Sequence, residues 1–404
     1  MLNTDPSPDQ PAQPQRQVEP PSEQFFPATQ TTAHERARVF LHRIGARLPP
    51  PLWRALRLVL KTVWWIITPH RISARLKHLR TPEAARAIEL DYSLAVPLSF
   101  PVAPSPTCRL AAVVHLYYEH LAGEMRTYLK EVPFPLDIYV SVRSEASKSA
   151  IERTFADWRN GTATVRVVPN QGRDIAPKLL AFRDVYDRYT HVLYLHGKQS
   201  SHTSALAPWR YYLCESLCGS PDIVTSIMAI FEQCPKIGMI AAQHFEPTRH
   251  WINWGNNFTT ANQLAQQMGF QLDPGAPLDF PSGSMFWART ASLKPLLDLH
   301  LSLDAFGKEK RQTDGTLAHA IERLFFHICE YAGYDWIKIV RPELMLCTPS
   351  IVTLDKLSGL DTFLKQHAFH LLNPGDMRPR MRPPPIIAQV SPKLDDIVRN
   401  RFSK

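Results

Sequence analysis

Residues 170–200 read NQGRDIAPKLLAFRDVYDRYTHVLYLHGKQS. The pattern predicts a strand end, a turn at Gly172, a helix, and then a buried strand over His191–Leu195. A polar cluster that includes Lys198 follows where this strand ends. In open α/β sheets, ligands bind at the carboxyl ends of the strands. The hydrogen-bond donors and the cation gathered here suit a diphosphate, so we expect the chemistry at this edge.

Strands and helices alternate on both sides of this stretch. Apolar runs predict further strands over Leu110–Tyr117, Leu136–Val142, Ala163–Pro169 and Ile237–Ala242. Helical periodicity predicts helices over Gly123–Val132, Ala146–Trp158, Pro177–Arg188, Pro208–Cys218 and Pro221–Cys234. Such alternation is typical of parallel βαβ units. We therefore predict an α/β domain over 107–348, with a mostly parallel central sheet flanked by helices.

Charge and cysteine content exclude several classes of protein. The net charge of +9 is concentrated, because residues 36–81 hold 11 Lys or Arg and no Asp or Glu. The remaining chain is nearly neutral, so we expect no nucleic-acid partner. The 6 cysteines lack zinc-ligand spacing and indicate reduced thiols in a cytoplasmic protein. The sequence shows no secretory signal and no apolar run long enough to predict a transmembrane helix.

Three segments lie outside the predicted domain. Residues 1–34 are rich in Pro and Gln and are predicted to be disordered, and 351–404 form a Pro-rich tail that we expect to be irregular. Residues 35–90 predict an N-terminal extension of basic amphipathic helices. Two interpretations of its basic part, 36–81, stay open. These helices pack on the main domain, or they bind the inner surface of the cytoplasmic membrane through Trp, Leu and Arg side chains.

Two polar clusters are candidates for binding a nucleotide sugar. The first surrounds the turn and contains Asn170, Gly172, Arg173 and Asp174. Its alternative interpretation is that Asn170 and Asp174 only cap the following helix. The second follows the strand and contains His196, Lys198 and Ser200. Many nucleotide-sugar enzymes place a metal-binding Asp-x-Asp here, whereas the ammonium group of Lys198 would neutralise a diphosphate directly. An ordinary exposed lysine at a strand end is the alternative.

Two later clusters are candidates for acceptor binding and catalysis. The first places Gly283 and Ser284 before the aromatic residues Phe286 and Trp287, which would form an acceptor wall or else a plain hydrophobic strand. The second is a predicted helix that begins near Asp314. Asp314 is our first candidate for the general base, ahead of Glu322 and then His319. The alternative role for Asp314 is a helix N-cap.

At these clusters the chain resembles the rhamnan synthesis protein F family of bacterial glycosyltransferase-like proteins. The resemblance spans about 107–340 and leaves both ends of the chain outside. It rests on His115-Leu116-Tyr117-Tyr118, the 170–174 turn, His196–Ser200 with Trp209-Arg210, Gly283–Trp287 and Asp314–Arg323.

The resemblance implies a GT-A-like fold and an inverting sugar transfer in which Asp314 is the base. It also implies a deoxysugar nucleotide donor such as dTDP-rhamnose and a polysaccharide or lipid-linked acceptor. His115 and Tyr117 would join the nucleotide site. Mg²⁺ or Mn²⁺ is compatible with this chemistry, but Asp-x-Asp is absent, so we name no cofactor as certain and no metal ligand.

We therefore expect a cytoplasmic glycosyltransferase, attached to the inner face of the cytoplasmic membrane if 36–81 is an anchor. A different class of function uses the same cleft without turnover. In that case the chain is a non-catalytic glycan-binding or polysaccharide-assembly protein with a degenerate transferase fold. A membrane scaffold acting through 36–81 is a third interpretation.

Overall fold

The structure is a computed structural model that describes residues 92–104, 108–197, 206–276, 278–308, 314–345, 351–367 and 392–403. Several predictions fall outside these ranges and remain predictions. They concern the disordered segment 1–34, the basic helices of 35–90, the side chains of Lys198 and Ser200, and the proline run of the C-terminal tail.

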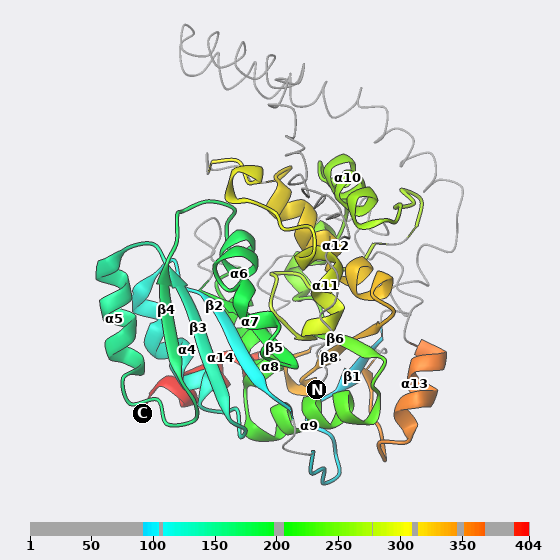
Figure 1. Ribbon diagram of the computed structural model, residues 1–404. Coiled ribbons are helices and arrows are strands. Elements are labelled where there is room, and N and C mark those ends of the chain that lie inside the picture. The colour runs from blue at the N-terminus through cyan, green and yellow to red at the C-terminus, as the bar shows by residue number, and fades with distance from the viewer. Residues whose placement is uncertain are drawn as a thin grey trace, which may run out of the picture. The chain divides into compact units, whose positions relative to one another are not determined.

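The described residues form a nine-stranded sheet in the order β4-β3-β2-β5-β7-β6-β8-β1-β9 (Figure 1). Strand β7 runs antiparallel to β5 and β6, and the other pairings are parallel. The predicted α/β fold with a mostly parallel sheet is therefore confirmed. The strands are β1 (Ser93–Ala95), β2 (Leu110–His115), β3 (Leu136–Val142), β4 (Ala163–Val167), β5 (His191–His196), β6 (Ile237–Ala242), β7 (Phe286–Arg289), β8 (Asp335–Val340) and β9 (Ile351–Val352).

Helices occupy the connections between strands. The predicted helix over Pro177–Arg188 is divided at Phe182, whose φ of −127° leaves the helical region. The α-helices are α4 (Ala122–Leu129), α5 (Glu145–Phe155), α6 (Ile175–Ala181), α7 (Arg183–Tyr186), α8 (Trp209–Cys218), α9 (Pro221–Gln233), α10 (Phe258–Met268), α11 (Lys294–Leu297), α12 (Leu317–Tyr331), α13 (Gly359–His367) and α14 (Pro392–Phe402). The 3₁₀ helices are η3 (Glu119–Leu121), η5 (Glu246–Trp251), η6 (Thr290–Leu293), η7 (Leu303–Ala305) and η8 (Pro342–Leu344).

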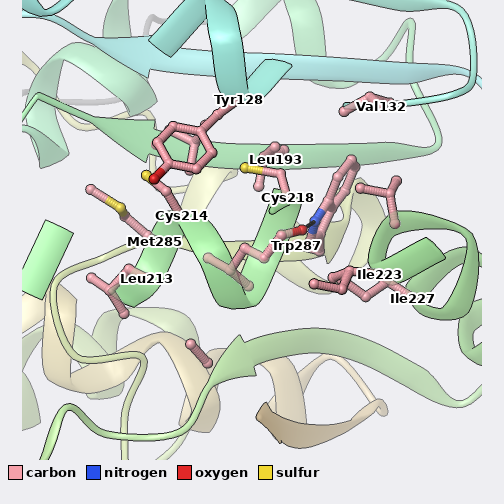
Figure 2. Packing of buried hydrophobic residues seen from close by; sticks show 14 of the residues in the cluster. Tyr128, Val132, Leu193, Leu213, Cys214, Cys218, Ile223, Ile227, Met285 and Trp287 are labelled. Carbon is pink, nitrogen blue, oxygen red and sulfur yellow. Dashed lines mark hydrogen bonds between the residues drawn. The ribbon is translucent and has the colours of Figure 1, made fainter. Parts of the chain in front are cut away.

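The two faces of the sheet are covered by separate hydrophobic layers. Successive side chains of a strand point to opposite faces, so Ala112 and Val114 of β2 join one layer while Ala111 and Val113 join the other. The first layer includes side chains of α4, α5, α8 and α9, and Figure 2 shows part of it around Trp287. The second includes side chains of α6, α7, α10 and α12. Both faces are buried, which accounts for the continuous apolar runs of the strands.

The C-terminal tail contains regular structure, which corrects the expectation that 351–404 is irregular. Strand β9 and helices α13 and α14 lie in it. Arg401 of α14 pairs with Glu131 at 2.8 Å and with Glu215 at 2.8 Å. The Glu215 side chain is fully buried and also accepts a hydrogen bond from Tyr128 at 3.0 Å. A buried carboxylate requires such partners, so α14 completes the domain instead of trailing from it.

Candidate functional site

The candidate site lies at the carboxyl ends of β2 and β5, which are neighbours in the sheet. The chain passes from β2 to β3 and β4, and then returns to β5 on the other side of β2. Connections that leave two adjacent parallel strands in opposite directions open a crevice there. His115 and His196 end these two strands and lie opposite each other in the register. Two of the predicted site residues therefore meet at this switch point.

The turn after β4 adopts an unusual backbone conformation. Gly172 has φ +72° and Arg173 has φ +57°, both in the left-handed region. A Cβ on Gly172 would collide with Ala176 and with the ring of Phe306. The turn therefore depends on glycine at position 172, and Arg173, whose backbone is strained, exposes its side chain in the turn after β4.

The helix-cap interpretation of this turn is wrong for Asp174. Asp174 is the N-cap residue of α6 but makes no side-chain cap hydrogen bond. Its Oδ2 instead accepts a hydrogen bond from Lys178 Nζ at 3.0 Å. Asn170 is exposed at the start of this turn.

Lys178 is a site residue that sequence reasoning missed. Its side chain is fully buried, and Nζ also donates to the carbonyl of Ser284 at 2.8 Å and lies 5.2 Å from the centre of the Tyr194 ring. Burial lowers the pKa of Lys178, and the carboxylate of Asp174 opposes that shift. The signal in the sequence was the four-residue spacing between Asp174 and Lys178 on an otherwise apolar helix.

The loop before β7 is held by side chains from α6, β5 and α12. His196 Nε2 donates to the carbonyl of Gly283 at 2.6 Å, and the amide of Gly283 donates to Glu322 Oε1 at 2.9 Å. Lys178 holds the next carbonyl, that of Ser284. Gly283 and Ser284 have φ of +83° and +53°, so the loop is fixed in a conformation that most residues avoid. The structure thus brings together His196, Gly283, Ser284 and Glu322, which the sequence had placed in separate candidate clusters.

The predicted acceptor wall is wrong for the two aromatic residues. Phe286 and Trp287 are both fully buried, on opposite faces of β7. Trp287 also donates its indole N–H to the carbonyl of Leu217 at 3.0 Å. Alternation along the strand sends the two rings into separate cores, so neither ring has a face open to a sugar.

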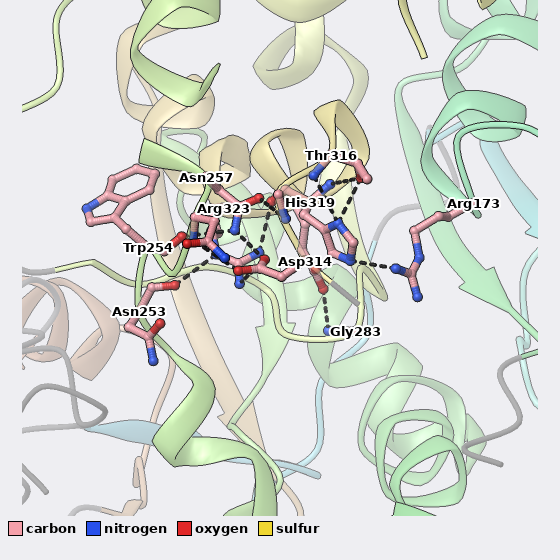
Figure 3. A network of polar contacts seen from close by, with 12 residues as sticks. Arg173, Asn253, Trp254, Asn257, Gly283, Asp314, Thr316, His319 and Arg323 are labelled. Atoms are coloured by element: carbon pink, nitrogen blue, oxygen red, sulfur yellow. Dashed lines mark hydrogen bonds and ion pairs between the residues drawn. The ribbon is translucent and has the colours of Figure 1, made fainter. Parts of the chain in front are cut away.

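Asp314 lies in a polar network that joins α12 to the loop before α10 (Figure 3). Its Oδ2 accepts from the amide of Asn256 at 2.9 Å and its Oδ1 from Asn257 Nδ2 at 2.5 Å. Arg323 lies 3.5 Å from Oδ1. Burial alone would raise the pKa of Asp314, but these hydrogen bonds and Arg323 hold it below its ordinary value. Asp314 is therefore an ionised, oriented carboxylate at neutral pH.

The N-cap interpretation of Asp314 is also wrong, because Thr316 caps α12. His319 Nδ1 lies 2.7 Å from the hydroxyl of Thr316, and its Nε2 lies 2.5 Å from Arg173 Nη1. A guanidinium can only donate, so Nε2 is the acceptor in its contact with Arg173. Burial, reinforced by the charge of Arg173, lowers the pKa of His319 to about 4. Its Nε2 lone pair is occupied by Arg173, which disfavours His319 as the base.

The ends of β2 and β3 present an aromatic and a cationic side chain side by side. The Arg143 guanidinium lies 5.1 Å from the centre of the Tyr117 ring. His115 Nδ1 lies 2.9 Å from the hydroxyl of Ser141. Burial lowers the pKa of His115 to about 4. Arg143 was missed because a single charged residue after a strand is common in any α/β protein.

The buried His115 predicts a pH dependence of stability. Its pKa is about 4 when folded and near 6.5 when unfolded. The unfolded chain therefore binds the proton first, and folding stability falls as the pH drops from 6.5 towards 4. Over this pH range the free energy of unfolding should fall by roughly 3 kcal/mol less in the His115→Gln variant than in the parent chain. Urea unfolding at pH 7.5, 5.5 and 4.5 measures this free energy for both chains. An equal fall in the parent chain and the variant would contradict the prediction.

The described residues contain no group of three or more His, Cys, Asp or Glu side chains that could hold a metal ion. The nearest candidate is Asp174, whose Oδ2 lies 3.8 Å from His196 Nε2. The ammonium group of Lys178 lies 3.0 Å from the same oxygen. A divalent cation at this oxygen would be repelled by that charge. Within the described part of the site, the residues do not fit a metal.

Comparison with known families supplies the identification. Residues 78–334 match the family described as rhamnan synthesis protein F. This chain belongs to the rhamnan synthesis protein F family. The match covers more than half of the chain and includes the turn at Gly172, the loop at Gly283 and the start of α12. The family resemblance seen in the motifs is confirmed.

Two curated relatives of this family member are proteins named "Uncharacterized protein WxcX", from two strains of Xanthomonas campestris pv. campestris. Each is 35% identical over 241 residues, which cover 59% of this chain and 34% of the relative. The chain thus spans about a third of the length of these relatives.

Solved structures give weaker matches. A mannosyltransferase from Pyrobaculum calidifontis, in complex with GDP-Man and Mn²⁺, is 12% identical with a TM-score of 0.37, over 83% of this chain and 84% of that chain. The bifunctional glycosyltransferase WbbM is 10% identical with a TM-score of 0.27, over 61% and 40%. These values are too low to assign an activity.

Across the described residues, no single helix is both long and apolar enough to cross a membrane. Helices α8 and α9, bent by 63°, reach the required length and composition only when they are taken together.

Proposed function

We propose that this rhamnan synthesis protein F family member is a GT-A-like glycosyltransferase. It transfers a sugar, rhamnose in our hypothesis, from a nucleotide-diphosphate donor to a cell-surface polysaccharide or its lipid-linked precursor. The anomeric carbon is inverted in one displacement assisted by a base.

One observation supports this proposal above the others. Side chains from α6, β5 and α12 converge on the Gly283 loop at the switch point between β2 and β5. These contacts fix the loop at the carboxyl edge of the sheet, where open α/β folds bind ligands, and Arg173 exposes a cation at the same edge. Family membership is consistent with a sugar nucleotide in that place.

Each group has a role in this hypothesis. Tyr117, with Arg143 and His115, lies at the end of β2 and β3, where it would receive the nucleoside. Arg173 is the exposed cation of the turn and would contact the diphosphate, together with Lys198 and Ser200. Positive charge held at the leaving group stabilises the transition state of transfer.

Asp314 would remove the proton of the acceptor hydroxyl in this scheme. The carboxylate is ionised at neutral pH, and Asn256, Asn257 and Arg323 fix its orientation. A fixed base within reach of the attacking oxygen contributes through both geometry and proton transfer. Glu322 instead anchors the Gly283 amide, so we place it in a positioning role.

A ligand screen tests the donor site. Nucleoside diphosphates and their sugar conjugates should raise the thermal midpoint by several degrees at saturating concentration, because only the folded chain binds them. Arg173→Ala should abolish the rise. Arg188→Ala is the matched control, because that arginine is exposed and pairs with Asp184 away from the site.

The same screen addresses the metal question and the alternative function. We expect the midpoint shift to persist in EDTA, since Lys178 opposes a cation at Asp174. A chain that binds oligosaccharide but no nucleotide, with or without Mg²⁺ or Mn²⁺, would instead be a non-catalytic glycan-binding protein.

We further propose that the chain works in the cytoplasm at the inner face of the cytoplasmic membrane, through the basic segment 36–81. The charge pattern of that segment supports this proposal. Flotation with anionic vesicles, using the full chain and a variant lacking 36–81, measures it. Equal flotation of both would contradict the anchor.

A further inference from the structure

A surface cavity of about 450 Å³ lies where α10, α11 and the C-terminal end of α12 meet. Both α10 and α11 contact α12, and Figure 1 shows the three helices. Helix α12 has 15 residues, so a rise of about 1.5 Å per residue places the cavity roughly 20 Å from Thr316, where the helix begins. Small-molecule sites usually measure about 300–1,000 Å³. The cavity is therefore a candidate binding site separate from the one near Asp314.

Tyr331, the last residue of α12, forms the aromatic side of this cavity. Its side chain lines the cavity, and the residue is 47% exposed. The ring stacks on Phe270, with centroids 4.8 Å apart and planes at 29°. Its hydroxyl lies against Gly269, the left-handed residue that ends α10, where an added Cβ would approach it to 2.6 Å. These contacts hold the ring in place, and an ordered side chain loses less conformational entropy on binding.

The other lining residues favour a neutral ligand that carries hydroxyl groups. Only Lys294 and Asp298 among them are charged, and their side chains pair with each other at 2.8 Å. The cavity therefore has no net charge that would attract an anion or a cation. Gln267 adds an exposed amide, which both donates and accepts hydrogen bonds, as a hydroxyl does. Met268 and Leu299 add apolar surface. A sugar ring matches this set, because it has C–H groups on its faces and hydroxyls around its edge.

We propose that this cavity is a second saccharide-binding site, which takes a neutral sugar ring against Tyr331. The faces of an aromatic ring carry partial negative charge, which attracts the weakly positive C–H groups of a sugar. The inference goes beyond the proposed transfer, because binding here needs neither a donor nor a base. If transfer occurs, the ring belongs to the polysaccharide that is being extended. A chain held at two points has a raised effective concentration at the transfer site.

Fluorine NMR locates the ligand without turnover. The full chain is labelled with 3-fluorotyrosine, and the resonance of Tyr331 is the one that is missing from Tyr331→Phe. Methyl α-L-rhamnopyranoside should shift this resonance in the parent chain, whereas D-glucuronate, an anion of similar size, should shift it much less. No shift with the neutral glycoside would overturn the site. An equal or larger shift with the anion would overturn the proposed class of ligand.

Saturation-transfer NMR measures the affinity for the same glycoside. Tyr331→Ala should weaken binding about tenfold, because the aromatic contact is lost, and Tyr331→Phe should retain most of it, because the ring remains. Trp251→Ala is the matched control, because Trp251 is exposed to nearly the same degree, 46%, but lies in η5 and does not line the cavity. Equal affinity in the parent chain and Tyr331→Ala, or an equal loss in Trp251→Ala, would contradict the proposal.

Calorimetry with nucleoside diphosphates on the same samples separates this proposal from the proposed function. Tyr331→Ala should bind them as the parent chain does, because the cavity lies at the other end of α12. Saccharide binding that depends on Tyr331, in a chain that binds no nucleotide, keeps the cavity site and rejects the transferase. Nucleotide binding in a chain whose Tyr331 resonance does not respond rejects the cavity site alone. Loss of nucleotide binding in Tyr331→Ala would show that the two sites are not separate and would overturn the proposal.

Discussion

Replacing Asp314 with Asn is expected to lower sugar transfer by about 10²- to 10⁴-fold, the range typical for loss of a positioned general base. The side-chain amide of Asn cannot remove the proton of the acceptor hydroxyl, although it has nearly the same shape as the carboxylate. Initial rates of transfer, measured with the donor found by ligand screening, give the effect. Donor binding should persist, because Asp314 lies just before α12, against the loop before α10, and not at the carboxyl ends of β2 and β5.

The Asp314 experiment needs a control for folding. Asp314 accepts from the Asn256 amide and from the Asn257 side chain, so the variant is expected to lose some stability. Asp184→Asn is the matched substitution, because Asp184 is exposed on α7 and pairs with Arg188. Rates should be compared at a temperature where both variants remain folded. Near-normal transfer by Asp314→Asn would remove Asp314 from the mechanism.

Lys178→Met is expected to destabilise the fold by about 3–5 kcal/mol, the usual cost of leaving one partner of a buried ion pair uncompensated. Asp174 would lose its cation, and the carbonyl of Ser284 would lose its donor. Chemical unfolding at neutral pH measures the change. Because Lys178 connects α6 to the loop at Gly283, the variant should also weaken nucleotide binding.

The chain contains a matched pair for this experiment. Lys294 and Asp298 have the same four-residue spacing on a helix, at 2.8 Å, but both side chains are exposed. Lys294→Met should therefore leave the unfolding midpoint almost unchanged. The double variant Lys178→Met with Asp174→Asn should recover part of the loss, because it removes the unpaired charge. If Lys178→Met proved as stable as Lys294→Met, the buried pair of Lys178 and Asp174 would not be what holds the site.

Local patterns predicted the strands well because burial on both faces leaves a continuous apolar run in each strand. β3 and β6 have the predicted bounds, and β5 extends one residue further, to His196. The turn at Gly172 was also predicted from local sequence, since a positive φ at a glycine is a property of the turn itself. The same patterns misplaced Phe286 and Trp287, because an apolar run does not show whether aromatic rings face a core or a ligand.

The amino-acid order alone determined which segments become strands and helices, that polar groups gather at strand ends, and the family to which the chain belongs. The strands and helices follow from periodicity over a few neighbouring residues, whereas the family follows from the resemblance of its motifs. The tertiary structure alone decided which distant side chains contact one another. Arg173 meets His319 across 146 positions, and Lys178 meets Ser284 across 106. Such contacts depend on strand order and register, which no local pattern encodes, so the buried ion pair of Lys178 became visible only in the folded chain.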